Sequence, residues 1–253
     1  MAGAAGARGE GQVNMLASAL QWLTAAESWS GPDGIPARLL EHLAVTALVV
    51  GVAALVAIPA GVAVGHTRRG RTTVAAIAGG ARAVPTLGLL TLLGLALGIG
   101  LEAPVIALVV LAIPSLLAGA YAGVENVDPA TVDGARAAGM TEMQIVRQVE
   151  LPLAAPVLVG GLRSAVLQVV STATLAAYIS NTGLGRYLYT GLKTQDYPLM
   201  LGGSLLVIVL ALVLELVLAA VQRAARRRAD PVATVSPTSD TMQVRTLIPE
   251  GSS

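Results

Sequence analysis

Charged residues are missing from five long stretches of the chain, each close to the length of a membrane-spanning helix. About 20 apolar residues in a helix cross the roughly 30 Å of hydrocarbon in a bilayer. The stretches are Ala44 to Thr67, Ala83 to Leu101, Ala103 to Val124, Ser164 to Gly185 and Tyr197 to Leu214. The second extends back to Thr72 if Arg82 is tolerated inside it, and the fourth to Leu153 with Arg163 in its first turns. The pattern predicts an all-α membrane protein with about five transmembrane helices.

Between the third and fourth stretches, the chain becomes polar over residues 125–152. Asp128 followed by Pro129 predicts a helix start, because a carboxylate caps the first N–H groups and proline at the first helical position loses no hydrogen bond. Gly139 is well placed to end that helix, since glycine readily adopts the left-handed conformation of a helix terminus. The interruption therefore begins with a short helix.

A second short helix is predicted directly after Gly139. Thr141 and Gln144 have the spacing of a capping box, and we expect Pro152 to stop the helix. On a helical wheel, one apolar face holds Met143, Ile145, Val146 and Val149. Two interpretations are open: an interfacial helix that only connects two spans, or a docking element that fits a groove on a cytoplasmic partner.

The basic residues predict how the chain is oriented in the membrane. They follow the first, third and fifth stretches, as Arg68, Arg69 and Arg71, then Arg136 and Arg147, then Arg223, Arg226, Arg227 and Arg228. Positive residues favour the cytoplasmic side. The N-terminus and the loops 101–104 and 181–196 are then expected outside, and the C-terminus inside.

The overall composition supports a membrane protein and excludes several chemistries. Hydrophobic residues make up 55% of the chain and charged residues 12%. The charged fraction is about half that of an average soluble domain. A net charge of +1 gives no reason to expect a nucleic-acid partner. The absence of cysteine excludes thiol chemistry, and no glycine-rich phosphate loop of the GxxxxGK[ST] type is present. His42 and His66 lie on opposite sides of the membrane in the predicted topology, so we expect no metal or other cofactor on this chain.

The same pattern divides the chain into three parts. Residues 1–43 are expected to form an extracytoplasmic segment that is disordered over the first 14 residues and then forms a surface helix with Trp22 and Trp29 at the headgroup level. Residues 44–222 are expected to form the transmembrane domain, with 125–152 as its long cytoplasmic loop. Residues 223–253 are expected to be a disordered cytoplasmic tail.

The spacing within the cytoplasmic loop resembles the signature loop of ABC importer permeases. That signature reads E-A-A, three residues, G, nine residues, I, one residue, L-P. The corresponding residues here are Asp133, Gly134 and Ala135, then Gly139, Val149, Leu151 and Pro152, and every gap matches. Asp133 and Gly134 depart from the usual Glu and Ala, although Asp133 keeps the acidic group. The resemblance implies that this loop, with Arg136 and Arg147 in it, is a coupling helix that sits in a cleft of a separate ATPase subunit.

Three further stretches resemble the permeases of osmoprotectant importers, which carry glycine betaine, choline, carnitine or proline. They are STATLAAYISNTGLGRYLYTGL (171–192), ARAVPTLGLL (81–90) and IPSLLAGAYAGV (113–124). Departures from the usual subfamily sequence occur at Gly119 and Ala120 and at Ser180, Asn181 and Thr182. The resemblance covers roughly residues 22–222.

Candidate residues of a translocation path lie at the outer end of the fourth stretch. A quaternary ammonium prefers the face of an aromatic ring, which makes Tyr178 a candidate, whereas Tyr187 and Tyr189 have the position of interfacial anchors. Ser171, Thr172 and Thr174 either line the path or bond back to their own helix.

Charged residues and prolines inside the spans also need an explanation. Arg82 must face protein or water, as a structural ion pair, in a snorkelling position or on the path, and Pro85 marks a kink beside it. Glu215 is expected to pair with the basic cluster that follows it.

The resemblance implies a transport subunit and not an enzyme. This permease would form half of a pore with a second permease, identical or paralogous, in the inner membrane. Two ATPase subunits carrying ATP and Mg would bind from inside, and a substrate-binding protein from outside. Three alternatives remain at this point: a permease for methionine or a sulfonate, an ion-coupled secondary transporter, and a membrane scaffold. A secondary transporter is expected to show acidic relays within its spans and two repeated halves.

Overall fold

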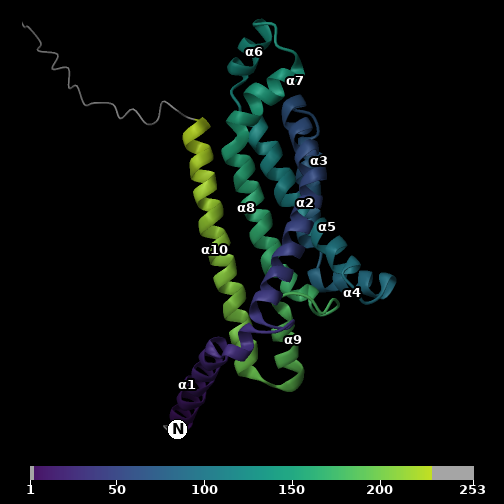
Figure 1. The fold of residues 1–253 in the computed structure, drawn as a ribbon. Coiled ribbons are helices and arrows are strands. Elements are labelled where there is room, and N and C mark those ends of the chain that lie inside the picture. Colours follow the sequence, from purple (N-terminus) through teal and green to yellow (C-terminus); the bar gives the residue numbers. More distant parts are fainter. Residues whose placement is uncertain (1–2, 230–253) are drawn as a thin grey trace, which may run out of the picture.

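The computed structural model describes residues 3–229, with side chains described from Asn14 onward except that of Arg82. All regular elements in this part of the chain are helices (Figure 1). They are α1 (Gly3–Thr24), a 3-10 turn (Ala26–Trp29), α2 (Ile35–Thr67), α3 (Arg71–Ala83), α4 (Thr86–Leu97), α5 (Glu102–Glu125), α6 (Pro129–Ala137), α7 (Glu142–Ile145), a π turn (Val146–Glu150), α8 (Leu151–Ala176), α9 (Gly185–Thr194) and α10 (Tyr197–Ala229).

Within the described residues, 4 helices are long and apolar enough to cross a membrane. They are α2, α5, the continuous helix Glu142–Ala176 that contains α7 and α8, and α10. α3 has 13 residues and α4 has 12, so each is too short to span alone. The two pass the same test only when taken together, and they are bent by 82° at the break between them. The expected all-α membrane fold with about five spans is confirmed, as four long helices and one bent pair.

The second span is therefore not the single helix predicted over Ala83 to Leu101. α3 ends at Ala83, Val84 is extended with ψ 122°, and Pro85 is the N-cap of α4. A residue before proline is pushed out of the α region, and proline has no N–H to continue the hydrogen-bond ladder. Gly98, at φ 90°, ends α4 before Leu101. The predicted kink at Pro85 is real and is sharper than a kink inside one helix.

Two other span boundaries differ from the prediction. α2 begins at Ile35 instead of Ala44, and α8 ends at Ala176 instead of Gly185. Arg38 is compatible with burial in the first turns of α2 because Glu41 and Asp33 neutralise it. The outer loop predicted over 181–196 contains the short helix α9.

The two ends of the chain also differ in part from the predicted disorder. α1 runs from Gly3, so most of the first 14 residues are helical, although they contain as many glycines as alanines and glycine disfavours a helix. Trp22 packs edge-on against Tyr187 at 5.0 Å between ring centroids, whereas Trp29 is exposed. At the other end, residues 223–229 form the last turns of α10, and 230–253 lie outside the described residues.

The core lies where α2, α5 and α8 pack together, and small residues allow their close approach. A Cβ atom added to Gly119 on α5 would lie 2.6 Å from the Cα of Gly161 on α8. A Cβ atom on Gly61 of α2 would lie 2.6 Å from the Cβ of Ala120 on α5. Small residues at such crossings are typical of membrane helices, whose association depends on close van der Waals packing.

The helix ends are sorted into two groups (Figure 1). The C-terminal ends of α2 and α10 lie at the same end of the bundle as α6 and α7. α1 and α9 lie at the opposite end. All three groups of basic residues named above are therefore at one end of the molecule.

Candidate functional site

The first part of the loop between α5 and α8 folds as the sequence predicts. The Asp128 carboxylate accepts a hydrogen bond from the backbone N–H of Ala130 at 2.9 Å and caps α6. Gly139 has φ 88°, which confirms the predicted left-handed terminus. Its N–H donates to the carbonyl of Arg136 at 3.0 Å, and the N–H of Met140 donates to the carbonyl of Ala135 at 3.2 Å. These two bonds form a Schellman motif, which satisfies the final carbonyls of α6.

α7 begins with the predicted capping box. The N–H of Thr141 donates to the Gln144 side chain at 2.8 Å, and the N–H of Gln144 donates to the Thr141 hydroxyl at 3.4 Å. The second predicted helix therefore starts at the expected residue. Its N-cap, Thr141, is only two residues after the left-handed Gly139, so α6 and α7 form a tight helical pair.

The prediction that Pro152 stops this helix is wrong. α7, the π turn and α8 run on as one helix from Glu142 to Ala176. In the π turn, the N–H of Leu151 donates to the carbonyl of Val146, five residues back. Pro152 lies at the start of α8, directly after this turn. A proline inside a helix needs relief from the clash between its ring and the carbonyl four residues back, and the wider π turn provides it.

The apolar face predicted for the second helix is only partly covered. Ile145 is buried, and Val146 and Val149 are half-buried. Met143, by contrast, is 60% exposed, and Arg147 is also exposed. The outward surface of α7 and the π turn therefore includes one large apolar side chain, Met143, and one cation, Arg147.

Arg136 fastens α6 to α7. Its guanidinium donates to Glu142 at 2.8 and 3.0 Å and to Asp133 at 2.8 Å. The bond to Glu142 raises the pKa of Arg136 above its usual value, so the cation persists at any physiological pH.

Of the predicted loop residues, Asp133, Gly134, Arg136, Gly139 and Arg147 lie on the surface of this pair. Ala135, Val149 and Leu151 are half-buried beneath it, and Pro152 is exposed.

Two residues of this region were missed by the sequence analysis. His66, in the last turn of α2, has Nδ1 2.8 Å from Glu150 and Nε2 3.2 Å from Glu142. Glu150 is buried, with 3% of its surface exposed. His66 and Glu150 are separated by 84 positions, so no local pattern could have paired them. We refer to α6, α7 and the π turn (residues 129–150) as the α6–α7 segment, and His66 links it to α2.

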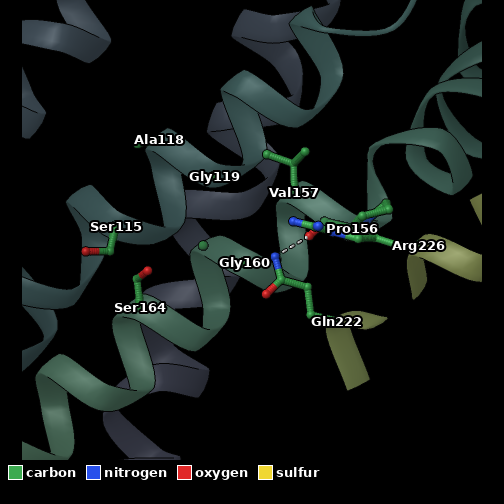
Figure 2. A pocket seen from close by; sticks show the side chains of 10 residues that line it. Ser115, Ala118, Gly119, Pro156, Val157, Gly160, Ser164, Gln222 and Arg226 are labelled. Atoms are coloured by element: carbon green, nitrogen blue, oxygen red, sulfur yellow. Dashed lines mark hydrogen bonds between the residues drawn. The ribbon is translucent and has the colours of Figure 1, made fainter. Parts of the chain in front are cut away.

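A cavity of about 370 Å³ lies between α5, α8 and α10. Small and polar residues line it, among them Ser115, Gly119, Gly160, Ser164, Gln222 and Arg226. Figure 2 shows Gln222 reaching from α10 to Pro156 on α8. The side-chain amide N–H of Gln222 donates a hydrogen bond to the carbonyl of Pro156 at 3.1 Å.

An adjoining cavity of about 460 Å³ shares Gly160, Ser164 and Gln222 with the first. Arg163 on α8 donates to the Gln222 side-chain oxygen at 3.0 Å and forms an ion pair with Glu215. The prediction that Glu215 pairs with the C-terminal basic cluster is therefore wrong, because its partner is on α8.

The hydroxyl residues predicted for the path bond back to their own helix. Ser171 donates to Leu167 at 2.9 Å, Thr172 to Gln168 at 2.7 Å and Thr174 to Ser171 at 2.7 Å. Such bonds satisfy the hydroxyl locally and leave its oxygen as an acceptor. Between α5 and α8, by contrast, the Ser115 hydroxyl donates to the side-chain oxygen of Gln168 at 3.0 Å. The sequence analysis missed this pair.

The three tyrosines differ in their surroundings. Tyr178 lies in the turn after α8 and is 62% exposed, with its ring centroid 5.5 Å from that of Tyr189. Tyr187 is not the interfacial anchor predicted, because it is buried and its hydroxyl donates to the carbonyl of Asp33 at 2.7 Å. Burial raises the pKa of Tyr187, so it stays neutral as a donor.

Arg82 is in the last turn of α3, and its side chain lies outside the described part of the structure.

A polar cluster holds the turn at residues 181–183 against the start of α2. Arg38 pairs with Asp33 and with Glu41, and it donates to the carbonyl of Asn181 at 2.8 Å. Glu41 in turn accepts a bond from the N–H of Gly183 at 2.9 Å. The cluster explains how a charged residue is tolerated within α2 and fixes the 181–183 turn.

The comparisons with known proteins agree with this arrangement. The family described as "Binding-protein-dependent transport system inner membrane component" matches residues 53–230. The chain belongs to this family. Its predicted class, a multi-pass inner-membrane permease subunit, is therefore confirmed, and members of the family generally work with an ATPase and a substrate-binding protein. The ion-coupled transporter and the scaffold are not supported.

Several curated relatives are similar over most of their length. The choline transport system permease protein OpuBB of Bacillus subtilis (strain 168) is 33% identical over 175 residues, which cover 69% of this chain and 81% of that protein. The glycine betaine/carnitine/choline transport system permease protein OpuCB of the same organism is 31% identical over 172 residues, covering 68% and 79%. The osmoprotectant import permease protein OsmW of Salmonella typhimurium (strain LT2) is 30% identical over 180 residues, covering 68% and 82%.

Solved structures show the same fold. A chain of the MetNI methionine ABC transporter in an inward-facing conformation superposes with a TM-score of 0.65 at 26% identity, covering 76% of this chain and 95% of that one. An amino acid ABC transporter solved with histidines gives a TM-score of 0.59 at 19% identity, which shows the fold alone. The expectation of an ABC importer permease core is confirmed.

Proposed function

We propose that this permease carries an osmoprotectant such as glycine betaine, choline, carnitine or proline into the cell. The observation that carries the proposal is the class of substrate in the names of the curated relatives, which specify choline, carnitine, glycine betaine or osmoprotectants. They match at 30–33% identity over about two thirds of this chain. The similarity to the methionine transporter, at 26%, favours methionine as the second candidate. A sulfonate has no such support.

Energy would enter through the α6–α7 segment. This segment is a capped, ion-paired element at the basic end of the bundle, and Met143 and Arg147 face outward from it. An apolar side chain rimmed by charge fits a groove on a partner surface. In this proposal the partner is an ATPase subunit, which holds ATP and Mg. The basic end is then cytoplasmic, the N-terminus is outside, and residues 223–253 are on the cytoplasmic side.

The pore would form from two permeases, identical or paralogous, with two ATPases inside and a binding protein outside. α9 and the Arg38 cluster lie at the outer end, and a cavity of about 360 Å³ opens there between Asp33, Asn181 and Arg186. The cavities around Gln222 contribute to the route between the two sides. Tyr178 and Tyr189 offer ring faces to a quaternary ammonium at the outer end.

Uptake by proteoliposomes tests this function. The chain is reconstituted with its co-purifying partners and its binding protein, and labelled glycine betaine and choline are followed with and without ATP in the lumen. ATP-dependent uptake that excess methionine leaves unchanged supports the osmoprotectant proposal. ATP-dependent uptake of methionine alone supports the second candidate. Uptake that follows an ion gradient without ATP contradicts both.

A further inference from the structure

The ion pair between Arg163 and Glu215 lies inside the membrane-spanning part of the bundle. α8 and α10 run in opposite directions, and Gln222 bonds to the carbonyl of Pro156 near the basic end (Figures 1 and 2). Arg163 and Glu215 each lie about two helical turns from this contact, or about 10 Å at 1.5 Å per residue. Arg223, next to Gln222, begins the basic cluster that marks the membrane boundary. The pair is therefore about 10 Å inside hydrocarbon that is roughly 30 Å thick.

The surroundings of the pair are constrained by this depth. A charged side chain inside the bilayer faces protein or water and not lipid. Within the single chain, however, the side chains of Arg163 and Glu215 are 31% and 30% exposed. Both line the cavity of about 460 Å³, with Gly160, Ser164 and Gln222 among its other lining residues. In the assembled transporter, the exposed part of the pair must therefore meet either another helix or the water of a solute route.

The hydrogen bonds of Arg163 favour the solute route. A guanidinium carries five N–H donors and no acceptor. Its Nε and Nη2 donate to the two oxygens of Glu215, and its Nη1 donates to Gln222. These three bonds leave two N–H donors without a partner in the described part of the chain. An apolar helix packed over the pair would bury these donors unsatisfied, which is costly, whereas water or a polar solute satisfies them.

The chemistry of the pair is complementary to a zwitterion. The planar guanidinium of Arg163 is well suited to bind a carboxylate through two parallel hydrogen bonds. The Glu215 carboxylate attracts a cation placed beside it, and a quaternary ammonium needs only this proximity because it has no N–H to donate. A zwitterion brings both charges and leaves the net charge of the site at zero.

Choline fits the same pair less well. It carries the quaternary ammonium but no carboxylate, so the donors of Arg163 gain no anionic acceptor from it. It also adds one positive charge to a neutral site at a depth where an uncompensated charge is costly. The pair therefore discriminates between the two kinds of osmoprotectant by charge.

The space beside the pair is large enough for such a solute. A volume of about 460 Å³ lies within the range of small-ligand sites, about 300–1,000 Å³. The adjoining cavity of about 370 Å³ shares Gly160, Ser164 and Gln222 with it and continues to Arg226 at the basic end. A solute leaving the pair thus has a polar surface to follow toward the basic end.

We propose that Arg163 and Glu215 form a binding site for zwitterionic solutes inside the membrane, with the solute carboxylate on Arg163 and its cationic nitrogen beside Glu215. The inference rests on the proposed function, because it assumes that solutes cross through these cavities. The ion pair stays formed when solute binds, since the carboxylate takes the donors that Glu215 leaves. The site makes the permease itself selective for glycine betaine, carnitine and proline over choline.

Equilibrium dialysis tests the site on the complex of permease and ATPase in lipid nanodiscs, without the binding protein. The probes are labelled glycine betaine and labelled choline, at concentrations that cover Kd values up to about 10 mM. Arg163→Lys keeps the positive charge beside Glu215 but loses the planar fork that holds a carboxylate. We expect this variant to bind glycine betaine about tenfold more weakly, as for one lost hydrogen bond between charged groups, and to bind choline as the wild type does.

Two further variants keep the test decisive. The double variant Arg163→Gln with Glu215→Gln replaces the ion pair by two neutral amides, leaves no unpaired charge, and is expected to lose glycine betaine binding even if Arg163→Lys fails to assemble. Arg223→Lys makes the matched substitution at an exposed position of α10 near the basic end, and it should leave both affinities unchanged.

Three outcomes overturn the inference. The first is no saturable binding of glycine betaine by the wild type, as expected if a second permease covers the pair. The second is equal glycine betaine affinity in the wild type and Arg163→Lys. The third is an equal loss of both ligands in Arg163→Lys, which assigns the pair a purely structural role. Absence of ATP-driven glycine betaine uptake by wild-type proteoliposomes would instead reject the proposed function.

Discussion

Arg163 on α8 and Glu215 on α10 form a bidentate ion pair, with Nε of the guanidinium 2.7 Å from a carboxylate oxygen. The two side chains are 31% and 30% exposed. The same guanidinium donates to Gln222, which donates onward to the Pro156 carbonyl. α10 is thus fastened to α8 at two successive positions by polar groups. Between membrane helices, such bonds supply specificity that apolar contacts alone cannot.

Removing the carboxylate should destabilise the bundle. In Glu215→Ala, Arg163 keeps its charge but loses its ionic partner. Breaking a fully buried pair costs about 3–5 kcal/mol and an exposed pair contributes at most about 1 kcal/mol, so about 1–3 kcal/mol is expected here. Thermal unfolding of the detergent-purified chain measures the change. Glu102→Ala, an exposed carboxylate at the start of α5, is the control and should differ from wild type by less than about 0.5 kcal/mol. Equal melting temperatures of the two variants would show that the pair contributes nothing.

The parts of this structure that the sequence predicted are the local ones. The Asp128 cap, the left-handed Gly139 and the capping box at Thr141 each depend on residues within a few positions, so their chemistry is visible in the sequence. The five apolar stretches were visible for the same reason. The misjudged Pro152 is instructive, because the usual rule for proline does not anticipate a π turn placed just before it.

The contacts between helices could not be read in this way. His66 and Glu150 are separated by 84 positions, and Arg163 and Glu215 by 52. Hydrophobicity shows that a helix is in the membrane, but it does not show which helix packs beside it. For Ser171, Thr172 and Thr174, the sequence allowed two interpretations: the hydroxyls line the path, or they bond back to their own helix. The structure shows the second, local interaction, because each hydroxyl donates to a carbonyl of α8.

Gly139 is expected to be essential for coupling because of its backbone conformation. A Cβ atom at Gly139 would meet nothing within 4 Å, so space is not the constraint. Its φ of 88° is the constraint, since β-branched residues strongly resist positive φ. In Gly139→Val we expect about 1–3 kcal/mol of strain to displace α7 relative to α6, and substrate-stimulated ATPase activity to separate from uptake.

The matched control is Gly134→Ala, at an open helical position on the same segment. Alanine should strengthen α6 by up to about 1 kcal/mol and preserve coupling. Both variants are assayed for ATP hydrolysis and uptake in the same proteoliposomes. If Gly139→Val keeps the wild-type ratio of transport to hydrolysis, the left-handed turn is not needed for coupling.

The crossing of α5 and α8 predicts a steric effect at Gly119. Even alanine would place a Cβ atom 2.6 Å from the backbone of Gly161, so the helices must separate. Overpacking of this kind costs about 1–3 kcal/mol. Gly119→Ala should therefore lower the melting temperature, whereas Gly51→Ala, with nothing within 4 Å of its new Cβ atom, should not. A melting temperature of Gly119→Ala equal to that of Gly51→Ala would contradict the close approach.

Substitution of Tyr178 tests whether the substrate first meets an aromatic surface on its route through the permease. Its ring is 62% exposed and lies 5.5 Å from that of Tyr189, so a ring face is available to a quaternary ammonium. A cation held against an exposed ring gains about 0.5–1 kcal/mol. Tyr178→Ala should therefore raise the KM for choline uptake roughly two- to fivefold, since about 1.4 kcal/mol corresponds to a factor of ten.

Tyr178→Phe keeps the ring face and should keep the KM, because the interaction needs the π-system and not the hydroxyl. Tyr197→Ala removes another exposed tyrosine, at the start of α10, and controls for general loss of aromatic surface. All three variants are compared at equal amounts of assembled complex. An unchanged KM in Tyr178→Ala would remove this residue from the route, whereas a rise in both Tyr178→Ala and Tyr178→Phe would assign the effect to the hydroxyl instead of the ring.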